Sequence, residues 1–148
     1  MIYISSDHNG FEYKAKIIEY LKSINEEIED LGPFVYDKDD DYPDYAFKLG
    51  EKVSSENVRG IIICGSGIGV CVACNKVNGV RAGYCESVEH AIKCKTDDNI
   101  NILVLDTIIV DEELDFKIIR TWLETPFSEE ERHVRRINKI SEYEKGRH

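Results

Sequence analysis

The stretch GIIICGSGIG, residues 60–69, decides the fold. Its first half, Gly60–Cys64, is a short apolar run rich in isoleucine, which is typical of a strand buried on both faces. Three glycines at alternate positions follow, and a helical pattern then extends to about Lys76. A strand, a glycine loop and a helix in this order indicate one β-α unit of a parallel sheet.

The same alternation runs along the whole chain, with apolar runs that predict strands and longer amphipathic stretches that predict helices. The predicted strands are Ile2–Ser6, Glu27–Leu31, Gly60–Cys64, Gly79–Tyr84 and Asn101–Leu105. The predicted helices are Phe11–Ser23, Pro43–Ser55, the stretch from about Ile68 to Lys76, Ser87–Lys95, Asp111–Leu123 and Ser128–Tyr143. We therefore expect one α/β domain over residues 1–148, with a doubly wound, five-stranded parallel sheet and helices on both faces. Such a sheet leaves a crevice at the carboxyl ends of its strands.

The composition excludes several classes of function. The chain is 42% hydrophobic and 32% charged, and no apolar stretch approaches the roughly 18 residues of a membrane span. It opens directly on a predicted strand without a secretory signal, so we expect a cytoplasmic protein. Its five cysteines, an odd number, are then expected to be reduced thiols. A net charge of −10 argues against nucleic acid as a partner.

Positive charge nevertheless collects at the C-terminal end of the chain. The segment Arg132–His148 is basic, and within it Arg132 and Arg136 lie four residues apart, on one face of the predicted helix. Two guanidinium groups on one face suit a phosphomonoester better than a polymer. A solvated terminal helix is the alternative interpretation.

The glycine loop and the cysteine before it form the strongest candidate site. Gly65, Gly67 and Gly69 let the backbone approach a ligand, and the helix that begins near Ile68 points free N–H groups towards it. The positive end of this helix also favours a thiolate, so we expect Cys64 to have a lowered thiol pKa and to act as a general base. Alternatively, the glycines only turn the chain and Cys64 is a small core residue. The loop matches neither the dinucleotide fingerprint nor the nucleophile elbow.

Two further candidates lie at the ends of predicted strands and helices. Asp7 and His8 end the first predicted strand, where a carboxylate and an imidazole can bind a sugar or a phosphate, or move a proton. A helix N-cap followed by a surface histidine explains the pair equally well. Tyr42 could face a sugar, although Asp41 and Pro43 around it also suit a plain helix start.

Cys71 and Cys74 have the spacing of a redox or zinc pair. They lie inside a predicted helix, past its first turn, and no second pair or histidine set completes a zinc site. We interpret them as small packed residues.

Taken together, these residues resemble the ribose-5-phosphate isomerase B family, which also includes the galactose-6-phosphate isomerase subunits. The resemblance extends from Ile2 to about Ile140. It rests on motifs in the family's order: Ser6–Gly10, Asp41–Pro43, Ile63–Gly69, Asn75-Lys76, Gly79–Ala82, and Arg132-His133 with Arg136.

The resemblance implies a Rossmann-like fold and a homodimer, or a tetramer, with active sites at the subunit interface. It implies a small phosphorylated sugar as substrate, no metal or organic cofactor, and no nucleic acid or membrane partner. The implied activity is the reversible conversion of ribose 5-phosphate to ribulose 5-phosphate, a step of the pentose phosphate pathway.

The resemblance also implies a role for each candidate residue. Cys64 would carry a proton between C2 and C1 of the open-chain sugar through a cis-enediolate, and Ser66 with the loop amides would stabilise the enediolate oxygens. His8, Arg132 and Arg136 would bind the phosphate, and Asp7 and Tyr42 would hold sugar groups. The full implied substrate-binding set is Asp7, His8, Tyr42, Gly65, Gly67, Gly69, Asp98, Arg132 and Arg136.

The chain departs from the family's pattern at several positions. Asp97 stands where the family has its ring-opening histidine, and Ile108 stands where it has a phosphate-binding arginine. Glu130 and Glu131 replace two glycines and, with Asp98, make the site more acidic. These changes leave two alternatives to a ribose-5-phosphate isomerase. One is a catalytically impaired sugar-phosphate binding protein, and the other is an isomerase of another pentose or hexose phosphate.

Overall fold

Five parallel strands form the central sheet of the computed structural model, which describes residues 1–146. The strands are β1 (Ile2–Ser6), β2 (Ile28–Asp30), β3 (Arg59–Cys64), β4 (Ala82–Tyr84) and β5 (Ile102–Asp106). Their order across the sheet is β2-β1-β3-β5-β4, and each neighbouring pair is parallel. The predicted doubly wound α/β fold is confirmed.

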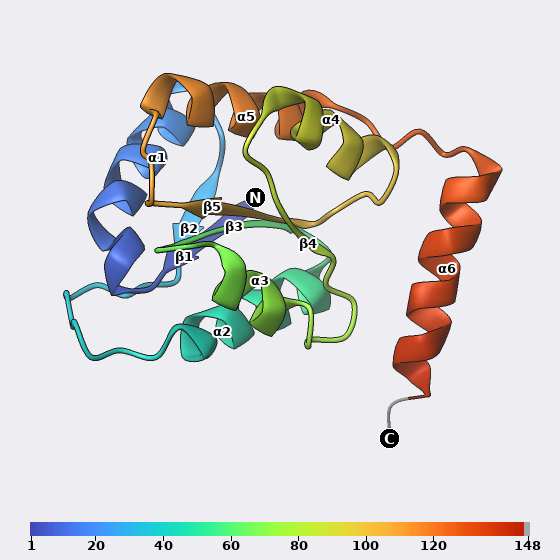
Figure 1. Ribbon diagram of the computed structural model, residues 1–148, viewed down its shortest axis with the longest axis horizontal. Helices are drawn as coiled ribbons and strands as arrows, with labels where there is room; N and C mark the ends of the chain where they lie inside the picture. The colour runs from blue at the N-terminus through green and yellow to red at the C-terminus, as the bar shows by residue number, and fades with distance from the viewer. Residues whose placement is uncertain (147–148) are drawn as a thin grey trace.

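Helices cover both faces of this sheet (Figure 1). The described helices are η1, a short 3-10 helix (His8–Gly10), α1 (Phe11–Ser23), α2 (Tyr42–Glu56), α3 (Ile68–Cys74), α4 (Val88–Thr96), α5 (Glu112–Glu124) and α6 (Glu131–Lys145). In Figure 1, α1, α4 and α5 lie on one face of the sheet, α2 and α3 lie on the other, and α6 stands to one side. Within residues 1–146, no helix combines the length and the apolar character that crossing a membrane requires.

The central strand β3 joins the two hydrophobic cores. Ile61 and Ile63 pack into the core under α1, α4 and α5, whereas Ile62 packs into the core over α2 and α3. This alternation arises because successive side chains of a strand point to opposite faces. It explains why an uninterrupted apolar run was needed here, and it fixes where Cys64 and the loop after it emerge.

The strand predicted over Gly79–Tyr84 is shorter than expected at its start. The prediction started β4 at Gly79, whereas the ladder starts at Ala82. Gly79 has a left-handed φ of 85°, and the N–H of Arg81 donates to the side-chain oxygen of Asn101 at 2.8 Å. Both features take the backbone out of the ladder before Ala82.

The last helix also begins later, at Glu131 instead of Ser128. Glu129 has a φ of 58°, which a right-handed helix does not allow. Ser128 instead receives the N–H of Glu130 on its hydroxyl oxygen, at 3.3 Å, and so ends the preceding segment with a local turn.

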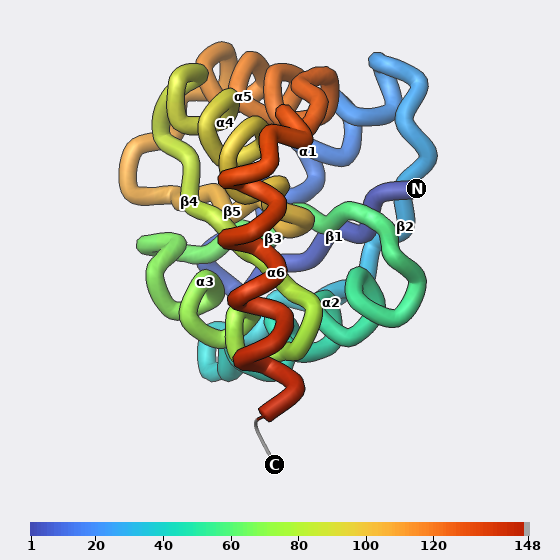
Figure 2. The backbone as a smooth tube through the Cα atoms, turned by 90° about the vertical axis from the view of Figure 1, so that its right-hand side faces the viewer, coloured from blue at the N-terminus to red at the C-terminus, as the bar shows by residue number. Residues whose placement is uncertain are grey.

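Helix α6 crosses the amino-terminal edge of the sheet (Figure 2). At its start, the buried His133 contacts Asp97, the residue that follows α4. Towards its end, Glu144 accepts the N–H of Gly79, which precedes β4, at 2.9 Å. Arg147 and His148, the end of the predicted basic segment, lie outside the described residues.

Candidate active site

The carboxyl ends of β1, β3 and β5 bring three functional groups to one edge of the sheet. β3 lies between the other two strands, with Ser6 paired with Ile63 and Cys64 paired with Asp106. Asp7, which follows β1, therefore lies beside Cys64, and Asp106 lies on its other side. The predicted crevice at this edge thus receives Asp7, Cys64 and the glycine loop.

The glycine loop is held by close backbone contacts. Gly67 has a left-handed φ of 76° and is the N-cap of α3. A Cβ at Gly69 would lie only 2.6 Å from the Tyr42 ring, so the ring rests directly on the loop backbone. Tyr42, the first residue of α2, is 41% exposed and borders the site from the face of the sheet that α2 and α3 cover. Glycine at position 69 is therefore required for Tyr42 to reach the site.

Cys64 is buried below this loop, with 4% of its surface exposed. Its sulfur accepts the N–H of Gly67 at 3.1 Å. Burial raises the pKa of the Cys64 thiol, and this effect outweighs the amide N–H groups of Val70, Gly67 and Ser66, which lower it. The predicted lowering of the Cys64 pKa is therefore wrong, because desolvation of a thiolate at this depth exceeds the stabilisation by the start of the helix.

Ser66 lies on the outer side of the same loop. Its side chain is exposed, and its Oγ accepts the N–H of Ile68 at 3.2 Å. The hydroxyl proton stays free to donate to a ligand oxygen, which is what the predicted role of Ser66 requires.

Asp7 and His8 lie across from the loop. Asp7 caps η1 by accepting the N–H groups of Asn9 and Gly10, at 2.9 and 3.2 Å, and burial raises the pKa of its carboxyl. His8 binds Asp40, with 2.6 Å between Nδ1 and Oδ1. Asp40 belongs to the acidic loop before α2 and was not among the predicted site residues. Nothing in its sequence context distinguishes it from the other aspartates of that loop.

Asp7, His8 and Asp40 are also the one group within residues 1–146 whose ligand atoms have the spacing of a metal site, all within 4.8 Å of one another. Hydrogen bonds already use Nδ1 of His8, Oδ1 of Asp40 and Oδ1 of Asp7. These bonds explain the close approach of the three side chains.

The remaining predicted site residues lie at the opposite edge of the sheet. Asp97 and Asp98 follow α4, which returns the chain to the amino ends of the strands, and Arg132 and Arg136 lie on α6 along that same edge (Figure 1). These four residues therefore do not lie at the predicted crevice at the carboxyl ends of the strands. A loop before a parallel strand lies at its amino end, and within one chain these residues do not meet Cys64.

Two arginines at this second edge form ion pairs with carboxylates. Arg132 donates to Glu130 at 2.9 Å, and Arg135 donates to both oxygens of Glu131 at 3.2 and 2.9 Å. Asp97 accepts the Thr96 hydroxyl at 2.8 Å, which with nearby Lys93, His133 and Arg132 lowers the pKa of its carboxyl.

Two residues of the recognised motifs fix the backbone here. The Asn75 side chain both donates to and accepts from the backbone of Ala82, at 3.0 and 2.9 Å, and so ties the end of α3 to β4. The Arg81 guanidinium donates to the carbonyl oxygens of Asp98 and Asn99, at 3.0 and 2.9 Å. The motif from Asn75 to Ala82 thus shapes the turn that carries Asp97 and Asp98.

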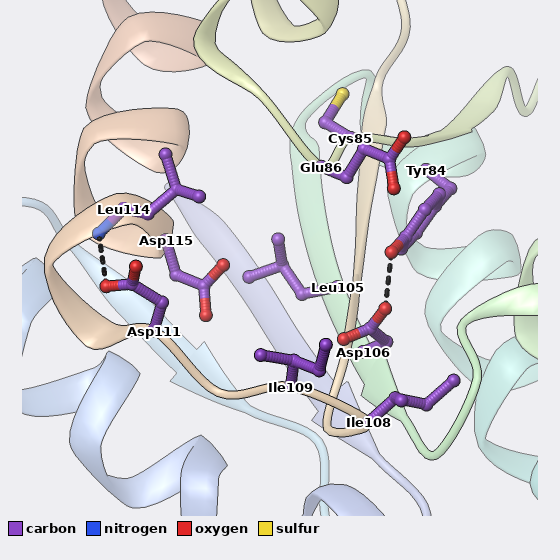
Figure 3. A pocket seen from close by; sticks show the side chains of 10 residues that line it. All are labelled: Tyr84, Cys85, Glu86, Leu105, Asp106, Ile108, Ile109, Asp111, Leu114 and Asp115. Atoms are coloured by element: carbon purple, nitrogen blue, oxygen red, sulfur yellow. Dashed lines mark hydrogen bonds between the residues drawn. The ribbon is translucent and has the colours of Figure 1, made fainter.

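A cavity of about 410 Å³ opens at the carboxyl ends of β4 and β5 (Figure 3). It adjoins the glycine loop, since a Cβ at Gly67 would lie 2.9 Å from the Tyr84 ring. Its lining is apolar and acidic, and comprises Tyr84, Cys85, Glu86, Leu105, Asp106, Ile108, Ile109, Asp111, Leu114 and Asp115. Four carboxylates and the apolar Ile108 make this side of the edge unfavourable for a phosphate. The predicted phosphate site therefore fits better on the other side, beside His8.

The motif pair Cys71 and Cys74 takes no part in this edge. Both are free thiols, and each donates to a backbone carbonyl oxygen, that of Ala82 and that of Ala46 respectively. Burial raises the pKa of Cys74 to about 12, so this thiol is inert at neutral pH.

Known proteins are similar in sequence to this chain over almost its full length. The family model described as ribose/galactose isomerase matches residues 2–140. The chain belongs to this family.

Several members of the ribose/galactose isomerase family that resemble the chain are named ribose-5-phosphate isomerase B. A Mycoplasma genitalium protein named as a probable ribose-5-phosphate isomerase B is 44% identical over 146 residues, covering 97% of this chain and 95% of the relative. Ribose-5-phosphate isomerase B of Mycobacterium tuberculosis is 34% identical over 145 residues, covering 97% and 90%. The crystal structure of the Mycoplasma genitalium ribose-5-phosphate isomerase B with bound ribulose-5-phosphate has a TM-score of 0.93 at 43% identity, covering 98% and 96%.

The raised pKa of Cys64 predicts its alkylation profile. Iodoacetamide attacks the thiolate, so we expect the rate at Cys64 in the native protein to keep rising above about pH 8.5, where an ordinary thiol is half ionised. Peptide mass spectrometry measures this rate, and the same peptide in the urea-unfolded chain is the control. If the rate in the native protein levels off at a lower pH than the rate in the unfolded chain, the prediction is contradicted.

Proposed function

We propose that this chain is an aldose–ketose isomerase that interconverts ribose 5-phosphate and ribulose 5-phosphate in the cytoplasm. The observation that carries the proposal is the position of Cys64 at the end of β3, under the glycine loop that leads into α3, in a chain with the fold of a relative that binds ribulose-5-phosphate. Five free cysteines agree with a reducing compartment.

Cys64 is proposed as the group that moves the carbon-bound proton. As a thiolate it takes the proton from C2 of the open-chain aldose, and the C–H electrons form the C1–C2 double bond of a cis-enediolate as the C1 carbonyl electrons move to O1. The proton of the C2 hydroxyl then passes to O1, C2 becomes the carbonyl carbon, and Cys64 returns its proton to C1. The N–H groups that lower the thiol pKa, from Gly67 and Val70, stabilise the thiolate that exists before the first step and after the last. The exposed Ser66 hydroxyl and the loop amides face the enediolate oxygens.

Replacing this proton carrier tests the function directly. For Cys64→Ala, we expect kcat on ribose 5-phosphate to fall by about 10²–10⁴-fold, the usual contribution of a general base, with KM nearly unchanged. Ketose formation is the measurement, and Cys74→Ala, which removes a buried thiol of the next helix, is the matched control. Full activity of Cys64→Ala would refute the proposed base, and a native protein that binds sugar phosphates without turnover would favour the binding-protein alternative.

We also propose that each active site is completed by a second copy of the chain, in a homodimer. Asp98, Arg132 and Arg136 lie at the amino edge of the sheet, so only another subunit can bring them to Cys64. Apolar surface surrounds the glycine loop, as expected of an interface: Ile68 and Ile109 are 69% and 80% exposed.

Mixing two inactive variants tests the shared site. Cys64→Ala removes one half of the site and Arg136→Ala the other, so a hybrid dimer contains one intact site. After random exchange of equal amounts, we expect about a quarter of the wild-type activity, because half of the dimers are hybrids with one working site each. Activity that stays at the sum of the separate variants, after subunit exchange has been verified by native mass spectrometry, would contradict the proposal.

Asp97 is a poor proton donor for the ring-opening step. The lowered pKa of its carboxyl keeps it ionised at neutral pH, and an ionised carboxylate has no proton to give to the ring oxygen. We therefore expect the enzyme to rely on substrate that is already in the open-chain form.

For Asp97→His, we expect a several-fold higher rate on ribose 5-phosphate, because an imidazole titrates near neutral pH and supplies the acid. The measurement is the rate on ribose 5-phosphate, which is mostly cyclic. The control is the rate on erythrose 4-phosphate, which cannot form the same stable ring. An unchanged rate on ribose 5-phosphate would end the ring-opening role of position 97.

A further inference from the structure

We propose that Asp40 is a positioning residue that holds His8 as an imidazolium and directs its Nε2–H towards the phosphate of the substrate. The inference deepens the proposed function and rests on it, since it takes a sugar phosphate as the ligand of His8. It concerns a residue outside the motifs that carry the family resemblance.

The geometry fixes both the position and the tautomer of the His8 ring. Oδ1 of Asp40 lies 2.6 Å from Nδ1 of His8 and also accepts the backbone N–H of His8 at 3.3 Å. One carboxylate oxygen thus holds the residue at two points. Because a carboxylate accepts, Nδ1 must carry a proton, and Nε2 at the far side of the ring remains for a ligand.

The burial of Asp40 adds an electrostatic requirement. Its side chain is 5% exposed, and its Oδ2 has neither solvent contact nor a hydrogen-bond partner among the described residues. A buried carboxylate in this state needs a positive charge beside it. Within residues 1–146, His8 is the basic side chain that pairs with Asp40.

The other groups around His8 act in the same direction. Asp7, the N-cap of η1, directly precedes His8, and Asp37 belongs to the same loop as Asp40. The bond to Asp40, together with the charges of Asp7, Asp37 and Asp40, raises the pKa of His8, against the partial burial that lowers it. The Tyr36 ring packs edge-on, 6.3 Å from the imidazole, and adds no charge.

The consequence is a cation fixed on an acidic edge. Ile108 supplies no charge, and the cavity beside it is lined by carboxylates, so a phosphate at this edge is expected on the side of His8, whose imidazolium supplies a positive charge. A neutral His8 could present a lone pair at Nε2 and repel the phosphate, whereas the imidazolium held by Asp40 donates a charge-assisted hydrogen bond. His8 keeps a quarter of its side chain exposed for this contact.

Asp40→Asn tests this role, because the amide oxygen still accepts a hydrogen bond while the charge is lost. Asp39→Asn, an exposed aspartate of the same loop, is the matched control. In ligand-free protein, NMR titration should show the His8 pKa falling by about one unit or more in Asp40→Asn and staying unchanged in Asp39→Asn. An unchanged His8 pKa in Asp40→Asn would overturn the proposal.

Kinetics separate a positioning role from a structural one. His8 stays protonated to a higher pH in the wild type than in Asp40→Asn. We therefore expect KM for ribose 5-phosphate to rise about tenfold at about pH 7.5 and less than about twofold at about pH 5.5, with kcat nearly unchanged. An equal rise of KM at both pH values, or a loss confined to kcat, would overturn the proposal. In a His8→Gln background, Asp40→Asn should have no further effect on KM, and a further effect would show that Asp40 acts by another route.

The two proposals fail in distinguishable ways. If the wild type does not isomerise ribose 5-phosphate, the proposed function fails. The His8 titration and the affinity for inorganic phosphate at both pH values then decide the role of Asp40 without turnover. If the wild type is active and Asp40→Asn behaves like Asp39→Asn, only the role of Asp40 fails. Should Asp40→Asn not fold, a wild-type His8 that titrates at or below about 6.5, the ordinary value, overturns the proposal by itself.

Discussion

The common direction of the five strands is the constraint on which the rest of the structure depends. Because every strand is parallel, all loops that follow strands lie at one edge, and all loops that precede them lie at the other. Cys64, Asp7 and the glycine loop belong to the first edge, and Asp97 and α6 belong to the second. No loop movement within one chain exchanges these edges, so a site that needs both sets of residues needs two chains. The apolar surface left around the glycine loop agrees with this requirement.

Electrostatics at the first edge is decided by burial. The start of α3 lowers the thiol pKa of Cys64 through its N–H groups, yet desolvation raises it by more. The same factor raises the pKa of Asp7. At His8, by contrast, the carboxylate of Asp40 outweighs partial burial, because the opposing charge is only a hydrogen bond away. The ionisable groups at this edge are therefore charged or neutral according to whether an opposite charge lies beside the buried group.

The sequence predicted most of the fold, because periodicity and turn residues act locally. The run Ile61–Ile63 identified the central strand, and Ile2–Ser6 and Phe11–Ser23 were predicted with the observed bounds. The errors arose where distant groups decide, as at Arg81, where the Asn101 side chain takes the place of a ladder partner. For the site, the order of the motifs identified the residues but not their separation, which the strand direction sets. Asp40 escaped prediction because its contact with His8 spans 32 residues and leaves no local pattern.

The burial of Cys64 also determines how the protein withstands oxidants. Peroxides attack thiolates that they can reach, and each such attack begins the path from sulfenic to sulfonic acid. Cys64 is 4% exposed and its pKa is raised, so at rest it is a protonated sulfur that peroxides rarely contact. A reactive base that is exposed all the time would be lost progressively under oxidative stress. The burial that raises the pKa of the proposed base therefore also protects its sulfur from oxidation.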